Sequence, residues 1–171
     1  MLAPMSEQAR ASTPIGPPRR RKFLLIVDGS PESKVAQRFA ARRAQSTGGI
    51  VSLLRVVAPP DPQAWLGVEA VMRAEAWQEA EALLHEAARN VNRLTGLYPE
   101  LIVREGRLRD EIVALIREDP MIAILVLGAG TGGEGPGPLV AAAAGPMANA
   151  FPIPVTIVPG RLTTAEVDAL A

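Results

Sequence analysis

The chain has 171 residues, and its 18 basic and 18 acidic side chains balance. This balance, together with few aromatic residues, argues against nucleic acid as the main partner. The absence of cysteine excludes disulfides and thiolate chemistry, and no apolar run approaches the roughly 18 residues of a membrane span. We therefore expect a cytoplasmic protein of one domain that binds neither nucleic acid nor a membrane.

The amino-terminal segment, residues 1–21, is polar and proline-rich and has no apolar periodicity. It carries too little apolar surface to offset the entropy of ordering, so we predict a disordered tail. The domain itself is expected to cover residues 22–160. Residues 161–171 form a carboxyl-terminal tail in which Thr163 or Thr164 can cap a short helix.

The first half of the domain begins with residues 22–27, KFLLIV, a short apolar run typical of a strand buried on both faces. Ser30 followed by Pro31 indicates a helix start, and the helix is expected to run to about residue 47. Residues 50–57, IVSLLRVV, are predicted to form a second strand.

A long helix is predicted over residues 68–95, because apolar side chains recur there at spacings of about three or four. Those side chains are Trp77, Ala80, Leu84, Ala87, Val91 and Leu94. Residues 101–105 are expected to form a third strand and residues 108–119 an amphipathic helix.

Residues 121–127, MIAILVL, are entirely apolar and predict a fourth strand. A glycine- and proline-rich loop begins at Gly128. Residues 139–150 then predict a helix that is bent or interrupted by the Gly-Pro pair in its middle. Residues 155–158, VTIV, predict a fifth strand.

The alternation of strands and helices predicts an α/β fold with an open five-stranded parallel sheet and helices on both faces. In such sheets, ligands bind beyond the carboxyl ends of the strands, where the strand order reverses. The turns that face this edge follow Asp28, Val57, Glu105 and Leu127.

No catalytic or metal-binding constellation is found in the sequence. The single histidine, His85, lies in the middle of a predicted helix, and no cysteine is available as a ligand. Neighbouring carboxylates such as Glu118 and Asp119 fit a solvated helix face better than an acid–base pair. We therefore expect no metal and no enzymatic activity, with slow ATP hydrolysis as the open alternative.

The segment GAGTGG, residues 128–133, formally matches the dinucleotide-binding pattern G-x-G-x-x-G. That pattern belongs after the first strand and needs an acid about 20 residues later, so the match is weak. A Walker loop would need a lysine, and none follows Lys34. Backbone N–H groups of Gly130, Gly132 and Gly133 can still form an anion nest.

Four blocks of the sequence resemble the universal stress protein (UspA-like) family. They are KFLLIVDGSPESKVAQRFAARRA from Lys22, IVSLLRVV from Ile50, ILVLGAG from Ile124 and FPIPVTIVP from Phe151, and the resemblance spans residues 22–159. It implies an open five-stranded α/β fold that dimerises. It also implies that some members bind ATP and act in stress responses.

The resemblance assigns two residues outside the loop. Asp28 matches the position that contacts the nucleoside, and Val56 matches the position that lines the adenine pocket. Asp28 can equally cap the first β–α turn. With the loop glycines, the nucleotide-binding set, if binding is retained, consists of Asp28, Val56, Gly128, Gly130, Gly132 and Gly133.

Nucleotide-binding members carry Gly-x2-Gly-x9-Gly-Ser/Thr after the fourth strand. A register anchored at the strand ends gives Gly128, Thr131, Ala141 and Ala142, of which only the first matches. A second register through Gly132, Gly135 and Gly145 fits the glycine spacing but has Pro146 in place of the hydroxyl residue. Glu134 adds a negative charge to the loop, which disfavours a triphosphate.

We therefore predict a dimeric, non-catalytic stress-response or regulatory module that needs no cofactor and binds ATP weakly or not at all. The alternative is an ATP-binding member that uses the variant loop. The fifth strand is apolar and β-branched and comes last in the sheet, so it is the expected homodimer edge. Its residues are Val155, Thr156, Ile157 and Val158.

Overall fold

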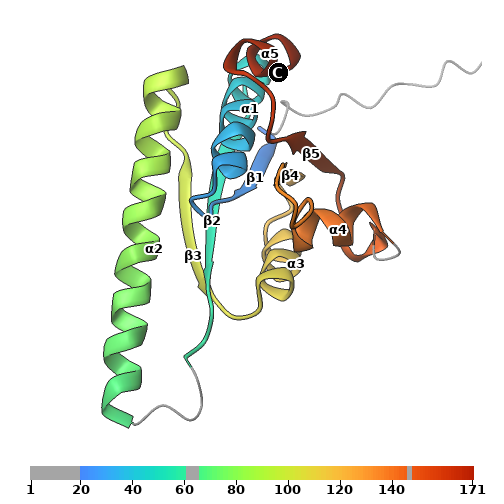
Figure 1. Ribbon diagram of the computed structural model, residues 1–171. Helices are drawn as coiled ribbons and strands as arrows, with labels where there is room; N and C mark the ends of the chain where they lie inside the picture. The colour runs from blue at the N-terminus through green and yellow to red at the C-terminus, as the bar shows by residue number, and fades with distance from the viewer. Residues whose placement is uncertain (1–19, 61–65, 146–147) are drawn as a thin grey trace, which may run out of the picture.

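The computed structural model describes residues 20–60, 66–145 and 148–171. The predicted tail over residues 1–21 lies outside them except for Arg20 and Arg21, and Pro146 lies outside them too. The elements follow in the order β1 (Lys22–Ile26), α1 (Pro31–Thr47), β2 (Ile50–Val57), α2 (Leu66–Thr95), β3 (Glu100–Glu105), α3 (Leu108–Glu118), β4 (Ile122–Ala129), α4 (Pro138–Ala144), a 3-10 turn (Ala148–Ala150), β5 (Val155–Pro159) and α5 (Thr164–Leu170) (Figure 1).

The five strands form one parallel sheet in the order β3-β2-β1-β4-β5. This confirms the predicted open α/β sheet. Strand order reverses between β1 and β4, because the chain moves outward through β2 and β3 and then crosses back beside β1. The carboxyl ends of β1 and β4 therefore mark the place where such folds bind ligands.

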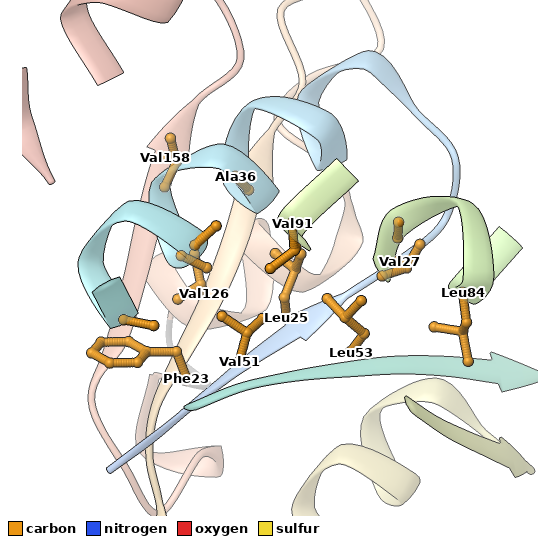
Figure 2. Close-up of a cluster of buried hydrophobic side chains, with 14 residues drawn as sticks. Phe23, Leu25, Val27, Ala36, Val51, Leu53, Leu84, Val91, Val126 and Val158 are labelled. Carbon is orange, nitrogen blue, oxygen red and sulfur yellow. The ribbon is translucent and has the colours of Figure 1, made fainter. Parts of the chain in front are cut away.

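Two hydrophobic cores lie on opposite faces of the sheet. On one face, α1 and α2 pack on the sheet, and Figure 2 shows Leu84 and Val91 of α2 beside Leu25, Val51 and Leu53 of β1 and β2. On the other face, the apolar sides of α3 and α4 pack against alternate strand residues, among them Leu24, Ile26 and Leu54 of the second core. This alternation explains why the inner strands are continuously apolar.

The first turn of α1 is fixed tightly against the sheet. Ser30 caps the helix by accepting a hydrogen bond from the backbone N–H of Ser33, and Pro31 occupies the first helical turn. The buried Ser33 hydroxyl donates to the carbonyl oxygen of Ile26 at 3.1 Å. These bonds hold the amino end of α1 directly above the end of β1.

Helix α4 is shorter than the sequence predicts. It spans only Pro138–Ala144 rather than residues 139–150, and a separate 3-10 turn covers Ala148–Ala150. Gly145 follows the last helical residue in an extended conformation, with φ −102° and ψ −162°. The backbone leaves the helical region there, which ends the helix.

The carboxyl-terminal residues 161–171 contain α5. Thr163 and Glu166 form a reciprocal capping box at its start. Asp168 of α5 accepts hydrogen bonds from Arg38 of α1 at 2.5 and 2.8 Å, and the apolar side chain of Val167 is almost completely buried. Helix α5 is thus packed onto α1 (Figure 1).

Candidate functional site

A pocket of about 210 Å³ lies at the reversal of the strand order. It receives residues from the carboxyl ends of β1, β2 and β4 and from the starts of α1, α3 and α4. The lining residues are Ile26, Asp28, Glu32, Ser33, Arg55, Val56, Leu108, Leu127, Gly128, Pro136, Gly137, Pro138, Leu139 and Val140. This is where the fold predicts a ligand.

Three of the six sequence-predicted site residues line this pocket: Asp28, Val56 and Gly128. Asp28 is exposed, and its Oδ1 accepts a hydrogen bond from the backbone N–H of Ser30 at 2.9 Å. The carboxylate therefore closes the first β–α turn while still facing the pocket. Val56 is partly buried and belongs to the apolar wall formed by the second core.

Gly128 brings the end of β4 into direct contact with α1. A Cβ on this residue would lie 2.4 Å from the carbonyl oxygen of Glu32, closer than any side-chain carbon can approach. Gly160 also packs against Glu32, since a Cβ on Gly160 would lie 2.8 Å from the Cβ of Glu32. Glu32 is therefore packed between Gly128 and Gly160, and neither glycine has room for a side chain.

The other three predicted residues, Gly130, Gly132 and Gly133, do not line the pocket. The N–H of Gly130 donates to the carbonyl oxygen of Pro136 at 3.2 Å, and the N–H of Gly135 donates to Gly132 at 3.2 Å. The loop thus closes on itself. Its Gly130 N–H is already used and cannot join an anion nest without opening the loop.

Glu32 is a pocket residue that the sequence analysis did not single out. A Cβ on Gly130 would lie 3.4 Å from Oε1 of Glu32, so this carboxylate faces the glycine loop. Together with Asp28, it places two carboxylates in the lining. Glu134, to which the sequence assigned the repelling charge, is exposed and lies outside the lining.

Arg55 is the second residue that sequence reasoning missed. It comes from β2, and its Nη1 donates to the carbonyl oxygen of Val27 at 3.4 Å. Among the described residues it is the one basic side chain that lines the pocket. The available signal was a charged residue inside the apolar run IVSLLRVV, directly before Val56.

The start of α4 also faces the pocket through Gly137 and Pro138. Gly137 has a φ of +93°, which favours glycine, and Pro138 has no N–H to offer a ligand. Ala141 and Ala142, the motif positions of the first register, lie inside α4 and not in the lining. Thr131, the remaining position of that register, is exposed in the loop.

The described lining of the pocket contains no histidine. His85 is exposed on α2, away from the pocket lining. Within residues 20–60, 66–145 and 148–171, no three histidine or acidic side chains gather closely enough to hold a metal ion. In this same part of the chain, no helix combines the length and apolar character needed to cross a bilayer.

Comparison with known proteins places this fold and pocket in context. A model described as the universal stress protein family matches residues 19–159. No curated protein matches the chain. The universal stress protein UspA from Lactobacillus plantarum superimposes with a TM-score of 0.68 at 16% identity, covering 82% of this chain and 98% of that one.

Two further solved structures are described with a nucleotide. The universal stress protein from Archaeoglobus fulgidus in complex with dAMP is 20% identical, with a TM-score of 0.58, and covers 81% of this chain and 98% of its own. A universal stress protein in complex with cAMP is 19% identical, with a TM-score of 0.57 and coverage of 83% and 98%. At these identities, the likeness establishes a shared fold.

Proposed function

The chain belongs to the universal stress protein family, and we propose that it is a non-catalytic stress-response or regulatory module that binds ATP weakly or not at all. The observation that carries this proposal is the carboxylate of Glu32, which lines the pocket and faces the glycine loop. A polyphosphate in the pocket would meet this charge at close range.

The balance of charge supports the proposal. Asp28 and Glu32 contribute two negative charges to the lining, and Arg55 contributes one positive charge. Like charges about 4 Å apart repel by about 1 kcal/mol in water and about 4 kcal/mol near a protein surface. A triphosphate is thus opposed by the net charge of the pocket, whereas an uncharged nucleoside is not.

The supply of hydrogen-bond donors supports the proposal as well. Phosphate sites in proteins use free backbone N–H groups at loops and helix starts. Here Gly130 already donates to Pro136, and α4 begins with Pro138, which has no N–H. The motif hydroxyl is also missing, since alanine or proline stands in its place in either register.

The alternative function is ATP binding through the variant loop, with slow hydrolysis. It is favoured by the convergence of Asp28, Val56 and Gly128 on one pocket. It is also favoured by the solved relatives described in complex with dAMP and cAMP. Mass spectrometry of the protein purified without added nucleotide separates the two functions. Our proposal expects no retained nucleotide, whereas a stoichiometric adenine nucleotide would establish the alternative.

The role of Glu32 is tested by a matched pair of variants. Glu32→Gln keeps the side-chain shape and removes the charge, so it should tighten ATP binding several-fold, mostly at low salt. Glu134→Gln removes an equally negative charge outside the pocket lining and should change affinity less. Equal effects of the two changes in calorimetry would contradict a specific role of Glu32 and show that only the overall charge around the pocket matters.

We further propose that the protein forms a homodimer in the cytoplasm through Val155, Thr156, Ile157 and Val158 of β5. This strand lies at one edge of the sheet, and within the described part of the chain it pairs only with β4. Ile157, an apolar side chain on this edge strand, is 37% exposed. An edge of this kind pairs readily with a second copy around a two-fold axis.

A further inference from the structure

A second and larger cavity lies away from the strand ends, between α1, α2 and α5. Its volume is about 460 Å³, compared with about 210 Å³ for the pocket described above. It is lined by Lys34, Val35, Gln37, Arg38, Ala41, Asn90, Val91, Arg93, Leu94, Leu162, Thr164 and Val167. We refer to these residues as the three-helix groove. Its volume falls within the roughly 300 to 1,000 Å³ of small-molecule sites.

The floor of the three-helix groove is apolar. Ala41 of α1, Val91 of α2 and Val167 of α5 are each at most 1% exposed. These three residues are already covered by other side chains, so the apolar surface open to a ligand comes from Val35, Leu94 and Leu162, which are only partly buried and pack on the first core. An apolar floor with a few polar groups at its rim is the usual build of a site for an organic molecule.

The rim of the groove carries more positive than negative charge. Arg38 is paired with Asp168, and the hydrogen bond from Arg38 lowers the pKa of that carboxyl below its ordinary value. Lys34 forms no ion pair with any described residue. Arg93 donates to Asn90 at 2.5 Å and has no acidic partner in the described part of the chain. Lys34 and Arg93 therefore have no ion-pair partner among the described residues.

The backbones of Lys34 and Arg93 lie toward opposite ends of the groove. Two hydrogen bonds fix the position of α1 along α2. Gln37 of α1 donates to the carbonyl oxygen of Ala87, and Arg42 of α1 donates to the carbonyl oxygen of Leu94. Lys34 thus lies before the first of these contacts, and Arg93 lies close to the second. With a rise of about 1.5 Å per residue, their backbones are separated by roughly 10 Å along the helices.

We propose that the three-helix groove binds an elongated organic dianion, with an apolar body on the floor and an anionic group at each end. Lys34 binds one end and Arg93 binds the other. The amino-terminal residues of this chain are a poor match for the groove, because residues 1–19 carry Arg10 and Arg19 against a single acid, Glu7. Glu86 lines a small adjoining hollow with Lys34 but lies beyond ion-pair distance of it.

Suberate, an eight-carbon dicarboxylate, is a probe with this chemistry, and octanoate is its matched monoanion. We expect suberate to bind the full chain in calorimetry or NMR titration at concentrations up to about 5 mM, and octanoate to bind more weakly. Lys34→Gln and Arg93→Gln should each weaken suberate binding by about five-fold, as the loss of one partly exposed ion pair does. Their thermal unfolding should be unchanged.

Arg43→Gln is the control, because Arg43 is exposed on the same helix as Lys34 but does not line the groove. It should leave suberate binding unchanged. The proposal is overturned if suberate does not bind, if octanoate binds as tightly, or if Arg43→Gln weakens binding as much as the two groove variants. ATP titrated in parallel keeps this site distinct from the pocket at the strand ends.

Discussion

Gly128 joins β4 to α1 through a contact that no other residue can make. The nearest atoms to its missing side chain are the carbonyl oxygen and carbon of Glu32, at 2.4 and 2.6 Å from a Cβ position. The same contact fixes where the Glu32 side chain begins. A glycine that resembles a phosphate-binding position thus has a structural role in holding the first turn of α1 in place.

A pair of alanine substitutions measures this role. Gly128→Ala should destabilise the protein by about 1 to 3 kcal/mol, since the new Cβ forces β4 and α1 apart. Gly132→Ala is the control: no atom lies within 4 Å of its Cβ position, and its φ is not in the left-handed region. It should change the unfolding free energy by no more than about 0.5 kcal/mol. Similar losses for both in urea unfolding would contradict this account.

Some residues of the pocket could be predicted from the sequence, and others could not. Asp28 and Val56 were predicted from the resemblance to the family and Gly128 from the glycine loop after the fourth strand, and all three line the pocket. Glu32 and Arg55 could not be predicted, because one is a common helix-start residue and the other is a single charge in a strand. Only the sheet order, with β1 between β2 and β4, brings both side chains to the same pocket.

Helix α2 consists of an exposed amino-terminal part and a part that packs on the sheet. The boundary between the two parts of this 30-residue helix lies at about Ala80. Before that point Val68, Val71 and Met72 are 49–56% exposed, and beyond it Leu84 and Val91 are each 1% exposed. The amino-terminal end of the helix extends past the sheet in Figure 1. The apolar periodicity in the sequence begins at Trp77, so it predicted the packed part of the helix.

Two truncations on α2 test this division. Leu84→Ala should destabilise the protein by about 2 to 5 kcal/mol, because it leaves a cavity in the first core. Val71→Ala removes apolar atoms from an exposed position on the same helix and should cost no more than about 0.5 kcal/mol. Both values come from denaturant unfolding. A loss above about 1.5 kcal/mol for Val71→Ala would show that the projecting end is packed in solution.

The molecule as a whole has two sheet edges, β3 and β5, and each exposes one large apolar side chain. Leu101 on β3 is 38% exposed and Ile157 on β5 is 37% exposed. Sequence reasoning could predict the five strands from their apolar runs, but the order β3-β2-β1-β4-β5 depends on long-range packing. Because β3 and β5 both lie at the ends of that order, the choice of β5 as the dimer edge rests on its apolar, β-branched residues.

The two edges offer a matched test of the homodimer. Ile157→Lys should shift the protein toward monomers in sedimentation velocity, because a charge at a strand edge prevents pairing with a second copy. Leu101→Lys places the same charge on the opposite edge and should leave the dimer intact. A dimer that survives Ile157→Lys and dissociates with Leu101→Lys would move the interface to β3.

The central claim is that this family member has a pocket at the strand ends that disfavours polyphosphate. Calorimetric titration of the unaltered protein with ATP tests it most directly. We predict a dissociation constant no better than about 0.1 mM, or roughly −5.5 kcal/mol. Micromolar ATP binding that is lost in Asp28→Ala would contradict the account and establish the protein as a nucleotide-binding member of the family.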